Sequence, residues 1–122
     1  MAPPYRSASR NKGGNRVEKL QMDIITDKID NIVQNLLIPV RTQKKMDSEL
    51  FDLFYGYLDE LLDAIRGEEM ITRRLTGLLF FIYTSLSGDV RNDDYKDPIF
   101  MQVSKLEGYL SEIYWDSPFG KY

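Results

Sequence analysis

Apolar residues recur every three or four positions along most of this chain, and this spacing constrains the fold more than any other feature. An α-helix has about 3.6 residues per turn, so the spacing places these side chains on one face of a helix. The first such stripe consists of Val17, Leu20, Ile24, Ile25, Ile29, Ile32, Val33, Leu36 and Leu37. Because proline cannot continue a helix without distortion, we expect this helix to stop at Pro39.

A second helix is indicated by Asp47 or Ser48 as its N-cap and by Glu49 near its positive N-terminal end. Gly67 is suited to end it in the left-handed conformation. Its apolar stripe consists of Leu50, Phe51, Phe54, Leu58, Leu61, Leu62 and Ile65.

A third helix is predicted from about Glu69 to Gly88, and it contains the run LTGLLFFIYTSL at residues 75–86. Between Leu78 and Tyr83 it is apolar around most of its circumference, so we expect it to be packed on several sides. The longest apolar stretch, Gly77 to Tyr83, is far shorter than the roughly 20 residues of a membrane-spanning helix.

Asp97 and Pro98 predict the start of a fourth helix, as N-cap and first helical residue, and Pro118 predicts its end. The chain has no useful stretch of alternating apolar and polar residues that would indicate a strand. The sequence therefore predicts an all-α fold, namely an antiparallel four-helix bundle with a disordered N-terminal arm.

Residues 1–16 are expected to form a flexible basic arm, because they contain prolines, glycines and four basic residues but no acid. Residues 17–122 are expected to form a single helical bundle domain with an aromatic C-terminal tail. This domain is acidic and offers no basic recognition helix, so direct binding to nucleic acid is not expected. Since the first residues are polar and unlike a secretory signal, we expect a cytoplasmic location.

Three helical segments contain a central glycine, in the similar sequences FYGYL, LTGLL and LEGYL. Glycine inside a helix costs about 1 kcal/mol relative to alanine. Close helix approaches at Gly56, Gly77 and Gly108 would account for this, and chance similarity in a leucine-rich chain is the alternative.

The chain has neither cysteine nor histidine, which removes thiolate ligands, the commonest metal ligand and the commonest general base near neutral pH. Asp59 and Asp63 share a helix face, but no Glu-x-x-His partner accompanies them. The Asp-rich loop after Gly88 has Arg91 where an EF-hand needs an oxygen ligand. We expect a protein that is not an enzyme and uses no metal or cofactor.

Four aromatic residues cluster near the C-terminus, namely Tyr114, Trp115, Phe119 and Tyr122. Aromatic side chains can anchor a protein interface, and they can equally fold back over the end of a bundle. We expect Trp115 or Phe119 to pack near the ends of the third and fourth helices, covering the outer side of residues 75–86, and part of this surface to serve in binding.

The segments LLDAIRG, EEMITRRLTGLLFFIY and KLEGYLSEI, followed by a short aromatic tail, resemble the enterocin A type of class IIa bacteriocin immunity proteins over about residues 30–122. The resemblance implies a small cytoplasmic four-helix bundle without catalytic activity. It also implies protection of a producing cell by binding a bacteriocin-bound membrane receptor, a sugar phosphotransferase permease, from the cytoplasmic side. The partner-binding residues would be Arg73, Arg74, Tyr114, Trp115 and Phe119.

A second hypothesis is an acidic helical regulator or inhibitor, phage-related or mimicking nucleic acid, that binds a nucleic-acid-binding protein. Its contacts would be the carboxylates Asp59, Glu60, Asp63, Asp93 and Asp94.

Overall fold

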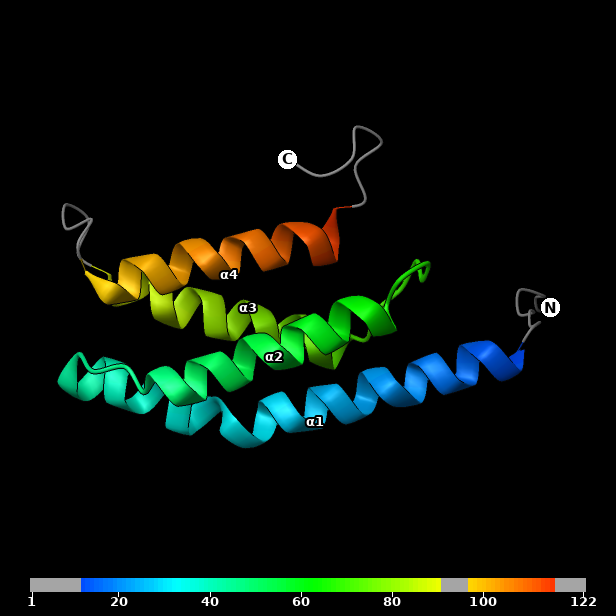
Figure 1. Cartoon of the computed structure of the whole chain (residues 1–122), viewed down its shortest axis with the longest axis horizontal. Coiled ribbons are helices and arrows are strands. Elements are labelled where there is room, and N and C mark those ends of the chain that lie inside the picture. Colours follow the sequence, from blue (N-terminus) through cyan, green and yellow to red (C-terminus); the bar gives the residue numbers. More distant parts are fainter. Residues whose placement is uncertain (1–11, 91–96, 116–122) are drawn as a thin grey trace.

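The structure is a computed structural model that describes residues 12–90 and 97–115, and in these ranges it is entirely helical apart from turns and short links (Figure 1). The helices are α1 (Lys12–Gln43), α2 (Ser48–Ala64), α3 (Arg73–Gly88) and α4 (Pro98–Tyr114). The predicted all-α four-helix bundle is confirmed.

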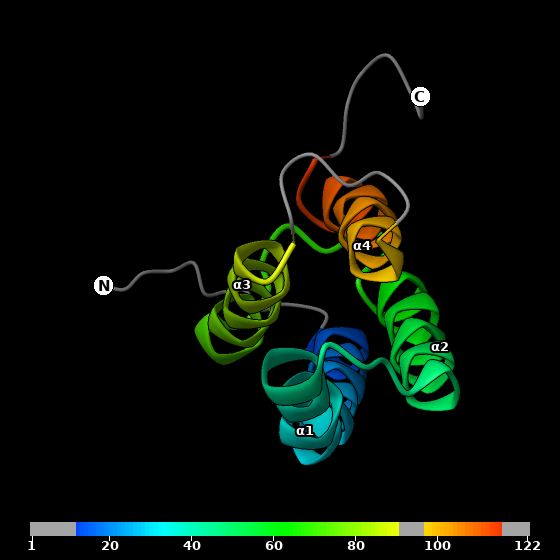
Figure 2. The ribbon, with the colours of Figure 1, turned by 90° about the vertical axis from the view of Figure 1, so that its left-hand side faces the viewer.

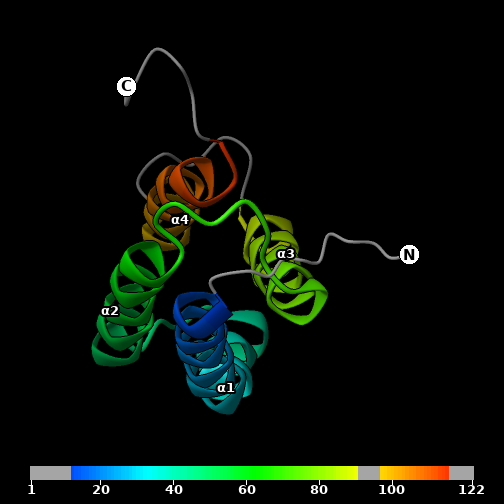
Figure 3. The ribbon, with the colours of Figure 1, turned by 90° about the vertical axis from the view of Figure 1, so that its right-hand side faces the viewer.

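Consecutive helices run in opposite directions, but they are not all neighbours (Figures 1, 2 and 3). Seen from either end of the bundle, α1 lies beside α2 and α3, and α4 lies beside α3 and, more loosely, α2. The helices α2 and α3 stand at opposite corners, so their link crosses the end of the bundle. It follows that α1 and α3 pack in parallel, as do α2 and α4.

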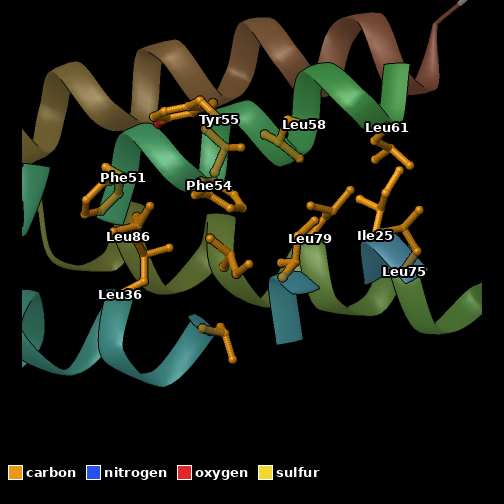
Figure 4. Close-up of a cluster of buried hydrophobic side chains, with 14 of the residues drawn as sticks. Ile25, Leu36, Phe51, Phe54, Tyr55, Leu58, Leu61, Leu75, Leu79 and Leu86 are labelled. Carbon is orange, nitrogen blue, oxygen red and sulfur yellow. The ribbon is translucent and has the colours of Figure 1, made fainter. Parts of the chain in front are cut away.

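One apolar core fills the space between the helices. Figure 4 shows Leu36 of α1, Phe51 of α2 and Leu86 of α3 converging toward one end of it. Ile25, Leu61 and Leu75 converge toward the other end. The largest fully buried side chains are Phe51, Phe54, Ile29, Leu36, Leu58, Leu61, Leu75, Leu79, Ile82, Leu86, Leu106 and Val40.

Each of the last three helices is preceded by an N-cap residue whose side chain accepts a hydrogen bond from a backbone N–H of the first turn. Asp47 accepts from Leu50 N at 3.1 Å and Asp97 accepts from Ile99 N at 2.8 Å, as the sequence predicted. Thr72 accepts from Leu75 N at 3.2 Å, so α3 begins after Thr72 rather than near Glu69. The residues before Thr72 are needed for the link that crosses the bundle, in which Gly67 has a φ of 82°.

The helix α1 extends beyond its predicted bounds in both directions. It begins at Lys12, within the range predicted to be the arm, and residues 1–11 lie outside the described residues. It also continues through Pro39 to Gln43, so the expectation that Pro39 stops it was wrong. Pro39 removes one helical hydrogen bond, but continuing the helix carries Val40 into the core, where it is fully buried.

Ion pairs connect the end of α1 to the end of α3. Arg41 Nε and Lys44 Nζ lie 3.6 and 3.7 Å from the carboxylate of Asp89, which is the C-cap residue of α3. The Asp89 side chain is only 14% exposed, so its charge is less screened than that of a surface carboxylate. These pairs connect the two parallel helices at one end, where Arg41 and Lys44 are themselves mostly exposed.

The three helical glycines do not mark close approaches between helices. A Cβ built on Gly56, Gly77 or Gly108 meets no atom within 4 Å, apart from its two chain neighbours and the backbone of its own helix. The expectation of close packing at these positions was therefore wrong, because all three lie away from the helix seams.

Replacing Gly77 or Gly108 by alanine should raise the free energy of unfolding by up to about 1 kcal/mol, because alanine restricts the unfolded chain and favours a helix. Urea unfolding of each variant measures the change. Gly67→Ala is the matched control, and it should be destabilising because its φ of 82° strains any residue with a Cβ. Destabilisation by Gly77→Ala would show that this position is more crowded than the structure indicates.

Candidate partner-binding surface

The outer face of α3 carries two exposed phenylalanines. Phe80 is 67% exposed and Phe81 is 55% exposed, whereas the residues on either side of this pair, Leu79 and Ile82, are fully buried. The expectation that this helix is packed on several sides was wrong. Only one stripe of α3 faces the core, and α1 and α4 lie along its two flanks, so no described segment covers the outer side.

A shallow, open hollow of about 580 Å³ lies along the seam between α3 and α4. Across this seam the hydroxyl of Tyr83 donates to Glu107 Oε2 at 2.7 Å. This hydrogen bond raises the pKa of Tyr83, because the neutral phenol is the donor. The residues that line the hollow are Tyr83, Glu107, Leu110, Ser111, Tyr114 and Trp115.

Tyr114 and Trp115 lie at the end of α4, where Trp115 is the C-cap residue. They are 47% and 59% exposed. Trp115 lines the hollow together with Tyr83 of α3, but it does not cover Phe80 and Phe81, so it does not provide the expected cover for the outer side of residues 75–86. Phe119 lies outside the described residues.

The two predicted arginines at the start of α3 differ in their surroundings. Arg74 lies 2.7 Å from Asp27 and 3.2 Å from Asp30, both on α1. Hydrogen bonds to Asp27 and then Asp30 raise the pKa of Arg74. Arg73 is exposed. Arg74 therefore contacts α1, while Tyr114 and Trp115 line the hollow between α3 and α4. The start of α3 and the end of α4 lie toward the same end of the bundle (Figure 1).

The carboxylates predicted to form an acidic face contact three different parts of the molecule. Asp59 accepts a hydrogen bond of 2.8 Å from Tyr109 of α4. Glu60 lies 3.4 Å from Lys28 of α1, and Asp63 lies 2.9 Å from Arg66. Asp93 and Asp94 lie outside the described residues. The geometry thus gives the acidic-regulator hypothesis no added support, and it stays a prediction.

The seam between α2 and α4 contains an aromatic cluster that sequence reasoning missed. The rings of Tyr55 and Tyr109 stack with centroids 5.3 Å apart, and Lys105 Nζ lies 4.4 Å from the Tyr55 centroid. The Tyr55 hydroxyl donates to the backbone oxygen of Gln102 at 3.0 Å. Tyr55 lies between Phe51 and Leu58 in the apolar stripe of α2, and this spacing was the available signal.

Burial raises the pKa of Tyr109 to about 12, and its hydrogen bond to Asp59 contributes in the same direction. Burial likewise raises the pKa of Tyr55. Both phenols therefore stay protonated as hydrogen-bond donors throughout the neutral range. The hydrogen bonds of these two hydroxyls connect α4 to α2.

Within residues 12–90 and 97–115, no group of three or more acidic side chains is placed to hold a metal ion. Nor does any helix in these ranges combine the length and apolar character needed to cross a membrane. Comparisons with models of known protein families, with curated proteins and with solved structures found no match for this chain.

Arg74→Ala should lower the melting temperature at low salt, because it leaves Asp27 and Asp30 close together without their shared partner. The difference from the parent protein should shrink at about 1 M salt, where the Debye length is about 3 Å. Arg73→Ala, the matched control at the neighbouring position, should change the melting temperature less. Equal effects of the two substitutions would argue against the bridge to α1.

Stability should fall as the pH rises above about 10. At a pH below about 10, the pKa of an exposed tyrosine, Tyr109 is protonated in both the folded and unfolded states. Its contribution to the free energy of unfolding is then fully present. Between about 10 and the folded pKa of about 12, the unfolded state ionises first and the contribution is lost. Urea unfolding over this pH range should show a shallower decline for Tyr109→Phe, and an identical decline would contradict the assignment.

Proposed function

We propose that this chain is a non-catalytic protein-binding module whose binding surface is the outer face of α3 together with the hollow beside it. The observation that carries the proposal is the exposure of Phe80 and Phe81, adjacent residues on a well-formed helix. Exposed aromatic residues that gather on one surface are typical of sites where another protein binds.

Burying these two side chains against a partner supplies a large part of the free energy that an interface needs. Full burial of a phenylalanine contributes about 1.5–3 kcal/mol relative to exposure. A phenylalanine also loses little rotamer freedom on binding compared with a long polar side chain. Phe80 and Phe81 are therefore the expected anchors of the interface, and Tyr114 and Trp115 extend it toward the end of α4.

The specific role that we propose is bacteriocin immunity. Phe80 and Phe81 belong to the segment EEMITRRLTGLLFFIY, which is one of the segments that resemble class IIa immunity proteins. The exposed surface and the resemblance thus coincide in one helix. In this role the chain binds a membrane receptor with its bound bacteriocin from the cytoplasmic side, and Arg73 adds a positive charge at the start of the same helix.

Expression of the chain in a bacterium sensitive to a class IIa bacteriocin should raise survival when that bacteriocin is added. The double variant Phe80→Ser, Phe81→Ser should lose at least tenfold in protection, because both anchors are removed. Its melting temperature should not fall, since neither side chain belongs to the core.

Met101→Ser is the matched control, because Met101 is 60% exposed on α4 and does not line the hollow. It should protect as well as the parent chain. Absence of protection by the parent chain against every class IIa bacteriocin tested would contradict the immunity role. Full protection by the double variant would contradict the proposed surface.

A further inference from the structure

We infer that the hollow between α3 and α4 receives a lysine or arginine side chain of the protein partner. This inference rests on the proposed protein-binding function and specifies the chemistry of one part of its surface. It depends on the residues that line the hollow, on the direction of their hydrogen bonds and on the charges around them.

The described walls of the hollow combine aromatic rings with a carboxylate. Tyr83, Tyr114 and Trp115 contribute the rings, and among residues 12–90 and 97–115 Glu107 is the only charged residue in the lining. The face of an aromatic ring carries negative electrostatic potential and attracts a cation, most strongly for tryptophan. A carboxylate beside such rings adds attraction of the same sign, so the hollow favours a positively charged group.

Hydrogen bonds within the protein have already used the donors of two lining hydroxyls. The Tyr83 hydroxyl donates to Glu107 Oε2 at 2.7 Å, and Ser111 Oγ donates to the backbone oxygen of Glu107 at 3.0 Å. Each hydroxyl has one proton, so both oxygens and the Glu107 carboxylate remain as acceptors. A group that satisfies them must bring donors, as a lysine ammonium or an arginine guanidinium does.

The basic side chains Arg74 of α3 and Lys105 of α4 contact other helices and not the hollow. Arg74 pairs with Asp27 and Asp30 on α1, and Lys105 lies over the ring of Tyr55 at the seam with α2. Neither they nor Arg73 line the hollow. Within the described residues, the negative charge of Glu107 is therefore not neutralised by a basic side chain of the protein's own helices.

The hollow is shallow and open to solvent, so a side chain supplied from outside can reach its lining residues. An apolar segment placed there would cover the Glu107 carboxylate while the Tyr83 hydroxyl remained its only described hydrogen-bond donor and no cation balanced its charge, which is costly. An anionic segment would be repelled, so a basic segment is the occupant that the lining favours.

A short peptide tests the inference without the cellular partner. The probe is a capped tetralysine peptide, and its control is the same peptide with every lysine acetylated, which removes the charge and keeps the length. Trp115 is the only tryptophan of the chain and lines the hollow, so its fluorescence reports on occupancy. The full chain should show a saturable change with tetralysine and little change with the acetylated peptide.

Two substitutions on α4 separate a specific site from general attraction to an acidic protein. Glu107→Gln should weaken tetralysine binding by up to about fivefold, because it removes the charge and preserves the shape. Glu112→Gln removes the same charge from the same helix but on the side of Tyr109, away from the hollow, and should have little effect. Tyr114→Leu should also weaken binding, since it removes a ring and keeps apolar bulk.

Several outcomes would overturn the inference. They are no saturable change with tetralysine, equal binding of the acetylated peptide, and equal weakening by Glu107→Gln and Glu112→Gln. In the bacteriocin assay, full protection by Glu107→Gln with loss of protection by the Phe80 and Phe81 double variant would reject the cation site and leave the proposed function standing. If tetralysine binding depended on Glu107 and the double variant kept full protection, the proposed surface at Phe80 and Phe81 would be rejected and the cation site would stand.

Discussion

The apolar face of α1 is the surface on which the rest of the bundle depends. Both α2 and α3 bury their own stripes against it, on either side of residues such as Ile29 and Leu36. The helix α4 contacts α2 and α3 instead and closes the core from the opposite side. Since the chain has no cysteine with which to form a disulfide, burial of these apolar side chains is the main source of its stability.

The polar contacts differ in kind between the two sides of the bundle. The described contacts of α1 with its neighbours include ion pairs, such as Lys28 with Glu60 and Arg74 with Asp27. At α4, tyrosine hydroxyls of the seams donate to acceptors across them, as Tyr109 does to Asp59. Exposed ion pairs contribute little individually, so these contacts set the alignment of helices that the core already holds together.

The separation of core and surface on α3 has a consequence for function. One stripe of this helix is sufficient to complete the core, which leaves Phe80 and Phe81 outside it. A binding surface made of such residues can change in evolution without loss of the fold. The same helix contributes Tyr83 to the hollow, so one regular element positions both parts of the proposed interface.

The spacing of apolar residues and the capping side chains Asp47 and Asp97 were sufficient to predict the number, order and approximate bounds of the helices, because these signals act between residues close in sequence. The tertiary structure alone decided that α1 continues past Pro39, that α2 and α3 stand at opposite corners, and that Phe80 remains exposed. It also brought Tyr83 and Glu107 together across a seam. These features depend on how each helix is rotated about its axis and which helix lies beside it, and that choice is made by the packing of side chains distant in the sequence.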